Sequence, residues 1–215
     1  DTWSESTPTF TQITATLKIL GGDADVDNFL VATRSNVQDL EAAIVQLKAK
    51  AVQQKFDDTF VNGDTASDAK AFDGIDKLTD SAQVVSMGTN GGSLTLEKLD
   101  EIIDRVKTGK PDMLLMSRRS RRKLTALGRA TGSGILVADR NQFGQMIQYY
   151  DGVPIGVNDW VSDAKTVGSS TDCSTIYAVQ FGEGSLVGLT APGGLQVERV
   201  GSLESAVERL TEAQR

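Results

Sequence analysis

The sequence predicts an α+β fold, in which helices and strands are mixed without regular alternation, and three observations lead to this class. Apolar and polar residues alternate over Ile13–Ile19, which is typical of a half-buried strand. Apolar residues then recur with a helical period over Asn28–Asp57. The second half is rich in strand patterns, with a hairpin signal at Asp151-Gly152 between Met146–Tyr150 and Val153–Val157. This irregular order argues against a doubly wound nucleotide-binding fold.

The composition is that of a globular protein. The chain has 215 residues, of which 22 are basic and 29 acidic, for a formal net charge of −7, and 39% are hydrophobic. This length corresponds to one large domain or two small ones. No apolar run approaches the ~20 residues of a membrane helix and no leader is visible, so we expect neither a membrane span nor a signal peptide. Because the chain begins at Asp1 and not at Met, we expect it to be processed or an excerpt.

Two absences in the composition argue against an enzyme. The chain has no histidine, which excludes Ser-His and Cys-His nucleophile pairs and removes the commonest metal ligand. Its single cysteine, Cys173, excludes an intrachain disulfide and a thiolate zinc cluster. We therefore expect no catalytic residues, no cofactor and no metal site, and a structural or incidental role for the Cys173 thiol.

The first predicted strand, Ile13–Ile19, ends at Gly21-Gly22 and follows a Ser/Thr-rich segment. That segment contains Trp3 and Phe10, which have no local apolar stripe to join. We therefore expect both aromatic side chains to pack on something outside their own segment.

The long periodic segment predicts an amphipathic helix that packs on a sheet. Asp27 or Asn28 can cap its start, and neither Gly nor Pro occurs from there to Asp57. Its apolar face consists of Leu30, Val37, Leu40, Ile44, Leu47 and Ala51. A coiled coil is less well supported, because the seam lasts about three heptads and has few flanking charge pairs.

The middle of the chain predicts two helices around a buried strand. A polar stretch after Gly63 predicts a mobile loop, and Phe72–Ile75 predicts a buried turn. Thr95–Val106 reads as a capped helix, and the apolar run Met113–Met116 as a buried strand. Ser117 can cap a further helix that ends at Leu127, before Gly128.

The last part of the chain predicts further strands at Ser174–Phe181, Ser185–Thr190 and Leu195–Val200. The polar tail Glu204–Arg215 is expected to be helical or frayed. The glycine-rich segment Gly88–Ser93 precedes a helix, but no lysine follows at the spacing of a phosphate-binding loop, so a plain loop is favoured. The paired carboxylates, such as Asp100-Glu101, leave a carboxylate-based hydrolase as a remote alternative.

The basic cluster at 117–123 is the most informative feature. Six of the 22 basic residues and no acidic residue lie between Met113 and Ala138. Arg118, Arg119 and Arg121 fall in the first turn of a predicted helix, where the helix dipole disfavours cations. Three explanations stay open: carboxylates of a neighbouring subunit, nucleic-acid phosphates, or a solvated face with local ion pairs.

The order of segments resembles the major capsid protein family of tailed bacteriophages, whose fold is shared with encapsulin shells. The segments that carry the resemblance cover roughly Trp3 to Val200. They are the strand into Gly21-Gly22, the long helix from Asp27, Phe60–Gly63, Phe72–Ile75, Leu96–Val106, Pro111–Met116, the Arg-rich helix, Tyr150–Ile155, Ile176–Val179 and Gly194–Val197.

The resemblance implies a peripheral domain, with a long spine helix and a long sheet, and an axial domain with a mixed sheet and flanking helices. Residues 1–20 would be the end of an extended loop and its returning strand, and 21–110 the peripheral domain with the spine helix. Residues 111–187 would form the axial domain, and 188–215 would return to the peripheral domain and end in a tail. Trp3, Phe10, Arg118, Arg119, Arg121 and Arg122 are the expected subunit-interface residues.

The implied function is that of a major capsid protein, a non-enzymatic structural protein that self-assembles as pentamers and hexamers into an icosahedral virion shell. The shell would enclose double-stranded DNA through non-specific contacts and would be assembled in the host cytoplasm. Scaffolding, portal or decoration proteins are further expected partners. Two alternatives stay open: an encapsulin-type nanocompartment, and a small nucleic-acid-binding protein that uses Arg118–Lys123.

Overall fold

A computed structural model describes residues 14–26, 33, 39–107, 109–131, 136–140, 144–182 and 184–190. The chain divides into two compact units, one formed by residues 1–17 and 188–215 and the other by residues 18–187. The helices and strands that the structure describes belong to the second unit. The described fold is therefore that of the second unit, residues 18–187.

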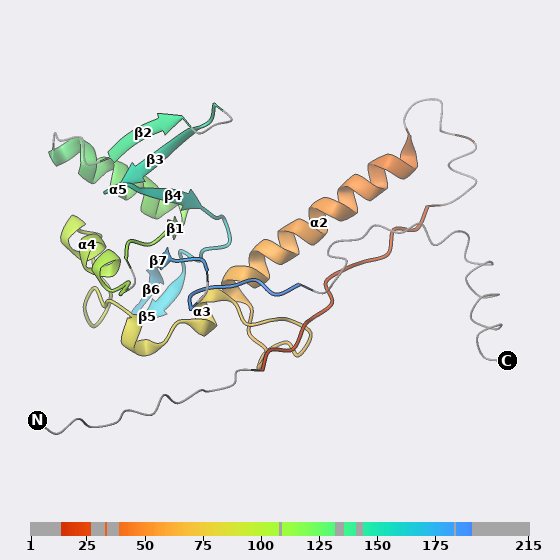
Figure 1. The fold of residues 1–215 in the computed structure, drawn as a ribbon, viewed down its shortest axis with the longest axis horizontal. Helices are drawn as coiled ribbons and strands as arrows, with labels where there is room; N and C mark the ends of the chain where they lie inside the picture. Colours follow the sequence, from red (N-terminus) through yellow and green to blue (C-terminus); the bar gives the residue numbers. More distant parts are fainter. Residues whose placement is uncertain are drawn as a thin grey trace, which may run out of the picture. The chain divides into compact units, whose positions relative to one another are not determined.

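A mixed five-stranded sheet carries most of the core of this unit. Its strands lie in the order β2-β3-β4-β1-β7 (Figure 1). They are β1 Met113–Met116, β2 Leu136–Arg140, β3 Met146–Tyr150, β4 Val153–Val157 and β7 Ile176–Val179. β1 pairs parallel with β4 and antiparallel with β7, whereas the β2–β3 and β3–β4 pairs are antiparallel. This mixed sheet with its helices confirms the predicted α+β class.

Strand β1 is buried on both faces, which explains its uninterrupted apolar sequence. The helices are α2 Leu40–Asn62, α3 Ile75–Leu78, α4 Leu96–Asp104 and α5 Arg118–Thr131, with a short 3-10 helix, η1, at Ser81–Gln83. Leu114 and Met116 pack in one cluster with side chains of α4 and α5. Leu115 points to the opposite face, where it joins Val61 of α2 and Ile75 of α3. Helices therefore cover both faces of the sheet at β1.

The predicted hairpin between β3 and β4 is confirmed with its predicted bounds. Both turn residues have positive φ, +48° at Asp151 and +79° at Gly152. These values are those of a type I′ turn, which matches the right-handed twist of the two strands. The turn leads directly into the pairing of Tyr150 with Val153.

Two predicted helix caps are also confirmed. The Thr95 side-chain oxygen accepts a hydrogen bond from the Lys98 backbone N–H at 3.4 Å, at the start of α4. The Ser117 hydroxyl accepts one from the Ser120 N–H at 3.2 Å, at the start of α5. In each case the side chain satisfies a backbone donor that lacks a partner within its helix.

The glycine-rich segment Gly88–Ser93 is a loop that packs on a small hairpin, β5 Lys165–Val167 with β6 Ser170–Cys173. The Asn90 side-chain oxygen accepts a hydrogen bond from the Ser169 N–H at 3.0 Å. A Cβ at Gly168 would overlap the Thr89 carbonyl oxygen, so the hairpin turn sits directly on this loop. The segment is therefore a loop that is held in place by the hairpin turn.

The strand predicted at Ile13–Ile19 is wrong for the residues that the structure describes. Residues 14–26 are in neither helix nor strand, and the Ile19 side chain is 97% exposed. An alternating pattern gives a strand only when a second strand supplies hydrogen bonds and another layer covers the apolar face. Within residues 18–187, a different contact holds this segment, because the Lys18 ammonium donates to the Ala69 carbonyl at 2.9 Å.

The predicted long helix is interrupted at Asp39. Asp39 has extended backbone angles, and its carboxylate accepts a hydrogen bond from the Ala42 N–H at 3.1 Å, so α2 begins at Leu40. It ends at Asn62, five residues beyond the predicted end. Of the predicted apolar face, Leu30 and Val37 lie outside the described residues. Leu47 is 68% exposed, because within the described residues α2 buries side chains only in its last turns.

Helix α5 continues past its predicted end to Thr131. Gly128 does not stop the helix. A Cβ there would lie 2.9 Å from the Leu136 Cδ1 atom, so the glycine lets α5 approach β2 closely.

The predicted strand Ser185–Thr190 is also wrong, since Leu186 makes only an isolated bridge with Phe181. The elements predicted at 195–200 and 204–215 lie outside the described residues.

Candidate functional site

The cationic start of α5 lies where two parallel strands end. The Asn158 N–H donates to the Met116 carbonyl at 3.1 Å, which extends the β1–β4 pairing by one bond. Because the carboxyl ends of parallel strands meet at one edge of a sheet, residues after β4 come beside the start of α5. This topology brings Asp159 and Asp163 to the arginine cluster.

Arg118 and Arg119 have anionic partners within the chain. The Arg118 guanidinium donates two hydrogen bonds to the Asp159 carboxylate, from Nε at 2.5 Å and from Nη2 at 2.6 Å. Arg119 donates to the Ser174 hydroxyl at 3.0 Å and to the Asp172 carbonyl, and lies 3.7 Å from the Asp163 carboxylate. These two arginines therefore have carboxylate partners within the chain, and their place in a subunit interface stays a prediction.

Asp163 connects the cluster to the sheet. Its Oδ1 atom accepts hydrogen bonds from the hydroxyls of Ser117 and Ser174, each at 2.5 Å. Burial of the carboxyl opposes ionisation, but these hydrogen bonds and the charges of Arg119 and Arg122 hold the pKa of Asp163 below its usual value. The carboxylate thus fixes the cap of α5 and the loop before β7 in one network.

The remaining cations of α5 lack such partners in the described residues. The side chains of Arg121, Arg122 and Lys123 have neither a hydrogen bond nor an ion pair with any residue that the structure describes. Arg122 and Lys123 are exposed and Arg121 is half-buried. Arg129, two turns further along, is likewise exposed and unpaired within the described residues. These charges are available to a molecule outside the chain.

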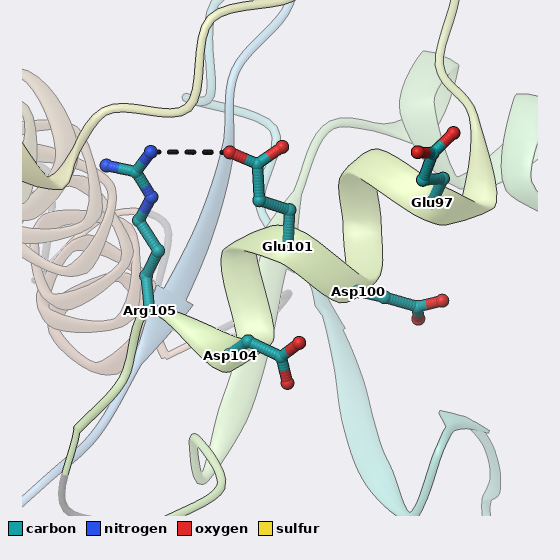
Figure 2. Close-up of a pocket in the computed structure, with 5 residues that line it drawn as sticks. All are labelled: Glu97, Asp100, Glu101, Asp104 and Arg105. Atoms are coloured by element: carbon teal, nitrogen blue, oxygen red, sulfur yellow. Dashed lines mark hydrogen bonds and ion pairs between the residues drawn. The ribbon is translucent and has the colours of Figure 1, made fainter.

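A second charged surface lies on α4, where an open pocket is lined by Glu97, Asp100, Glu101, Asp104 and Arg105 (Figure 2). The Glu101 carboxylate is paired with Lys98 at 2.6 Å and with Arg105 at 3.3 Å. Figure 2 shows Asp100 and Asp104 projecting away from the Glu101–Arg105 pair. Glu97 and Asp104 have no partner within the described part of the chain. This helix therefore presents net negative charge.

Asp100 is held in place by a tyrosine from the sheet. The Tyr150 hydroxyl donates to the Asp100 Oδ1 atom at 2.6 Å. Burial and the neighbouring carboxylates raise the pKa of Tyr150, so the hydroxyl keeps its proton and remains a donor. The bond ties the acidic surface of α4 to strand β3.

The described residues contain neither a metal-binding cluster nor a helix suited to span a membrane. No group of three or more acidic or cysteine side chains in the described ranges is placed to hold a metal ion. Among the helices that the structure describes, none combines the length and apolar character needed to cross a membrane. Cys173 is half-buried, with its sulfur 3.9 Å from the Asn90 carbonyl oxygen. Trp3 and Phe10 lie outside the described residues.

Comparison with models of protein families assigns the chain to a family. The model of the phage capsid family matches residues 1–201. The chain belongs to the phage capsid family. Its fold is similar to that of a chain in the holo-SrpI encapsulin complex from Synechococcus elongatus PCC 7942, a cryo-electron microscopy structure, with a TM-score of 0.55 and 21% identity. The similarity covers 66% of this chain and 48% of that one, so this chain spans about half of the encapsulin subunit. No curated protein matches the chain significantly by sequence.

The structure of this capsid-family chain describes four of the six predicted interface residues, the arginines. The first turns of α5 hold Arg118, Arg119, Arg121 and Arg122. The sequence alone did not identify Asp159 and Asp163 as their neighbours. The strand before Asp159 is evident in the sequence, but its parallel pairing with β1 is not, so no local signal joins these residues to the arginines. The acids of α4 did leave a signal, because Glu97, Asp100 and Asp104 recur at helical spacing.

Proposed function

We propose that this chain is a major capsid protein of a tailed bacteriophage, which self-assembles as pentamers and hexamers into an icosahedral shell around double-stranded DNA. The observation that carries the proposal is the match of the phage capsid family model over residues 1–201. The proposed role is structural, without catalysis, cofactor or metal. The protein would reside in the virion and be assembled in the host cytoplasm.

The proposed domains follow the elements of residues 18–187. The sheet β2-β3-β4-β1-β7 and helix α5 lie within 111–187, the proposed axial domain. Helix α2 lies within 21–110 and is the proposed spine helix. Residues 188–215 would return to the peripheral domain, with 1–20 as the end of an extended loop. In this arrangement Arg121 and Arg122 would face a neighbouring subunit, as would Trp3 and Phe10.

One observation favours a second shell function. A solved structure that is similar in fold is an encapsulin complex. An encapsulin-type shell would use the same subunit contacts but would enclose protein cargo in place of DNA. The contents of the particle therefore distinguish the two functions.

The test is to purify the full-length protein and examine it by light scattering and negative-stain electron microscopy. We expect closed particles of uniform diameter. Nuclease-protected DNA in particles from infected cells would support the phage capsid, and a co-purifying protein without DNA would support the encapsulin. A protein that stays monomeric at high concentration would contradict both.

A nucleic-acid-binding protein is the remaining candidate. The observation in its favour is that the side chains of Arg121, Arg122 and Lys123 make neither a hydrogen bond nor an ion pair within the described residues. Against it, Arg118 and Arg119 are paired with carboxylates, which reduces the charge available to phosphates. Scaffolding, portal or decoration proteins are further proposed partners of the assembled shell.

A further inference from the structure

Two oppositely charged stripes lie on the same layer of the fold. Leu99 and Ile103 of α4 and Leu124 of α5 share one core cluster, so both helices cover the same face of the sheet. Opposite these buried residues, α4 exposes Glu97, Asp100 and Asp104, the acidic stripe. Helix α5 exposes Arg122, Lys123 and Arg129, the cationic stripe.

The stripes are matched in length. Glu97 and Asp104 are seven residues apart, as are Arg122 and Arg129, and seven residues of α-helix span about 10.5 Å. The exposed residues between the two arginines include Ala126, whose small side chain does not obstruct a facing helix. Two such stripes can therefore lie against each other with acid and base in register.

The stripes do not neutralise each other within one chain. Two α4 carboxylates have partners in the described residues: Glu101 is paired with Lys98 and Arg105, and Asp100 accepts a hydrogen bond from Tyr150. Within the described residues no ion pair joins α4 to α5. Because each copy carries both stripes, one copy can satisfy another by a head-to-tail contact, the type that closes into rings.

We infer that the acidic stripe of α4 docks against the cationic stripe of α5 on a neighbouring copy of this chain. The inference rests on the proposed function and adds to it the acceptor surface for the cations. Exposed ion pairs contribute little energy each, so the stripes set the orientation and rate of subunit contact more than its strength.

The test uses two charge-reversal variants of the full-length protein. One carries Glu97→Lys with Asp104→Lys, so that both stripes are positive, and the other carries Arg122→Glu with Arg129→Glu, so that both arginine positions are negative. Alone, each variant is expected to assemble at least about tenfold less than the wild type at low ionic strength. An equimolar mixture is expected to recover mixed rings of six subunits, because positive and negative stripes then alternate between copies. Rings of five subunits cannot alternate and are not expected to recover.

Controls separate this contact from general charge effects. Lys48→Glu with Lys50→Glu changes the net charge as much as the arginine variant does, but at exposed positions on α2. It should assemble like the wild type, and circular dichroism should show that all variants are folded. Reversal variants that assemble normally, or a mixture that forms no mixed six-membered rings, would overturn the docking inference while wild-type particles still support the shell. A wild type without particles would overturn the proposed function and this inference together.

Discussion

At the scale of single residues, Asp163 has the most connections in the described arginine cluster. It accepts hydrogen bonds from Ser117 and Ser174, and it lies within ion-pair distance of Arg119. Asp159 also binds an arginine, but this pair is highly exposed: the exposed fraction is 59% for the Asp159 side chain and 71% for the Arg118 side chain. Solvent screens such a pair, so the two aspartates should differ in their contribution to stability.

Replacing Asp163 by Asn should lower the free energy of unfolding by about 1–2 kcal/mol, because charge-assisted hydrogen bonds to two hydroxyls are weakened. The matched variant Asp159→Asn should cost about 0–1 kcal/mol. Urea denaturation followed by circular dichroism measures both. Equal losses in the two variants would contradict the role assigned to Asp163.

The same carboxylate predicts a pH dependence. The pKa of Asp163 is lower in the folded chain than its usual value of about 3.9, so its contribution is fully present above that value. It is lost as the pH falls through the lowered folded-state pKa. The difference in unfolding free energy between wild type and Asp163→Asn should therefore shrink as the pH is lowered from 6 towards about 3. A difference that stays constant over this range would argue against a lowered pKa.

At the scale of elements, the end of α2 is shaped by two glycines. The Gly74 N–H donates to the Gly63 carbonyl at 2.8 Å, which joins the end of α2 to the start of α3. A Cβ at Gly63 would overlap the Phe72 carbonyl oxygen, and one at Gly74 would lie 2.7 Å from the Gly63 nitrogen. The backbones approach too closely for any side chain, so the predicted buried turn Phe72–Ile75 requires both glycines.

Gly63→Ala should destabilise the fold by about 2 kcal/mol or more, because backbone atoms must move to admit the methyl group. Gly21→Ala is the matched control, since a Cβ there meets nothing within 4 Å. It should change the unfolding free energy by less than about 0.5 kcal/mol. Thermal and urea denaturation of both variants check the prediction, and a well-tolerated Gly63→Ala would show that the crossing is looser than described.

At the scale of the whole molecule, charge is segregated along the sequence and partly rejoined by the fold. The net charge is −7, yet 113–138 contains six basic residues and no acidic one. Folding brings Asp159 and Asp163 to Arg118 and Arg119 and leaves Arg121 and Arg122 without an ion pair in the described residues. The proposed shell would use the charges that the fold leaves unpaired.

The double variant Arg121→Ala with Arg122→Ala should therefore lower the assembled fraction by about tenfold, equivalent to about 1.4 kcal/mol, without unfolding the chain. Light scattering and negative-stain images measure assembly, and retention on double-stranded DNA at several salt concentrations measures binding. Lys48→Ala with Lys50→Ala serves as the charge-matched control. Intact assembly together with a large loss of salt-dependent DNA binding would favour the nucleic-acid-binding alternative over the shell.

The sequence alone determined the elements whose signals are local. The Asp151-Gly152 hairpin, the Thr95 and Ser117 caps and the buried strand β1 follow from interactions between residues at most four positions apart or from apolar runs. The segment order also indicated the phage capsid family, which the family match over residues 1–201 confirmed.

Only the tertiary structure decided the environment of the cationic cluster. The parallel pairing of β1 with β4 brings Asp159 to Arg118 across 41 positions of sequence, and no local pattern encodes that pairing. The pattern at Ile13–Ile19 likewise shows only that a strand is permitted, since pairing depends on distant backbone. Short-range hydrogen bonds and the alternation of apolar and polar side chains depend on neighbouring residues. Strand partners and ion pairs depend on which distant segments the core brings together.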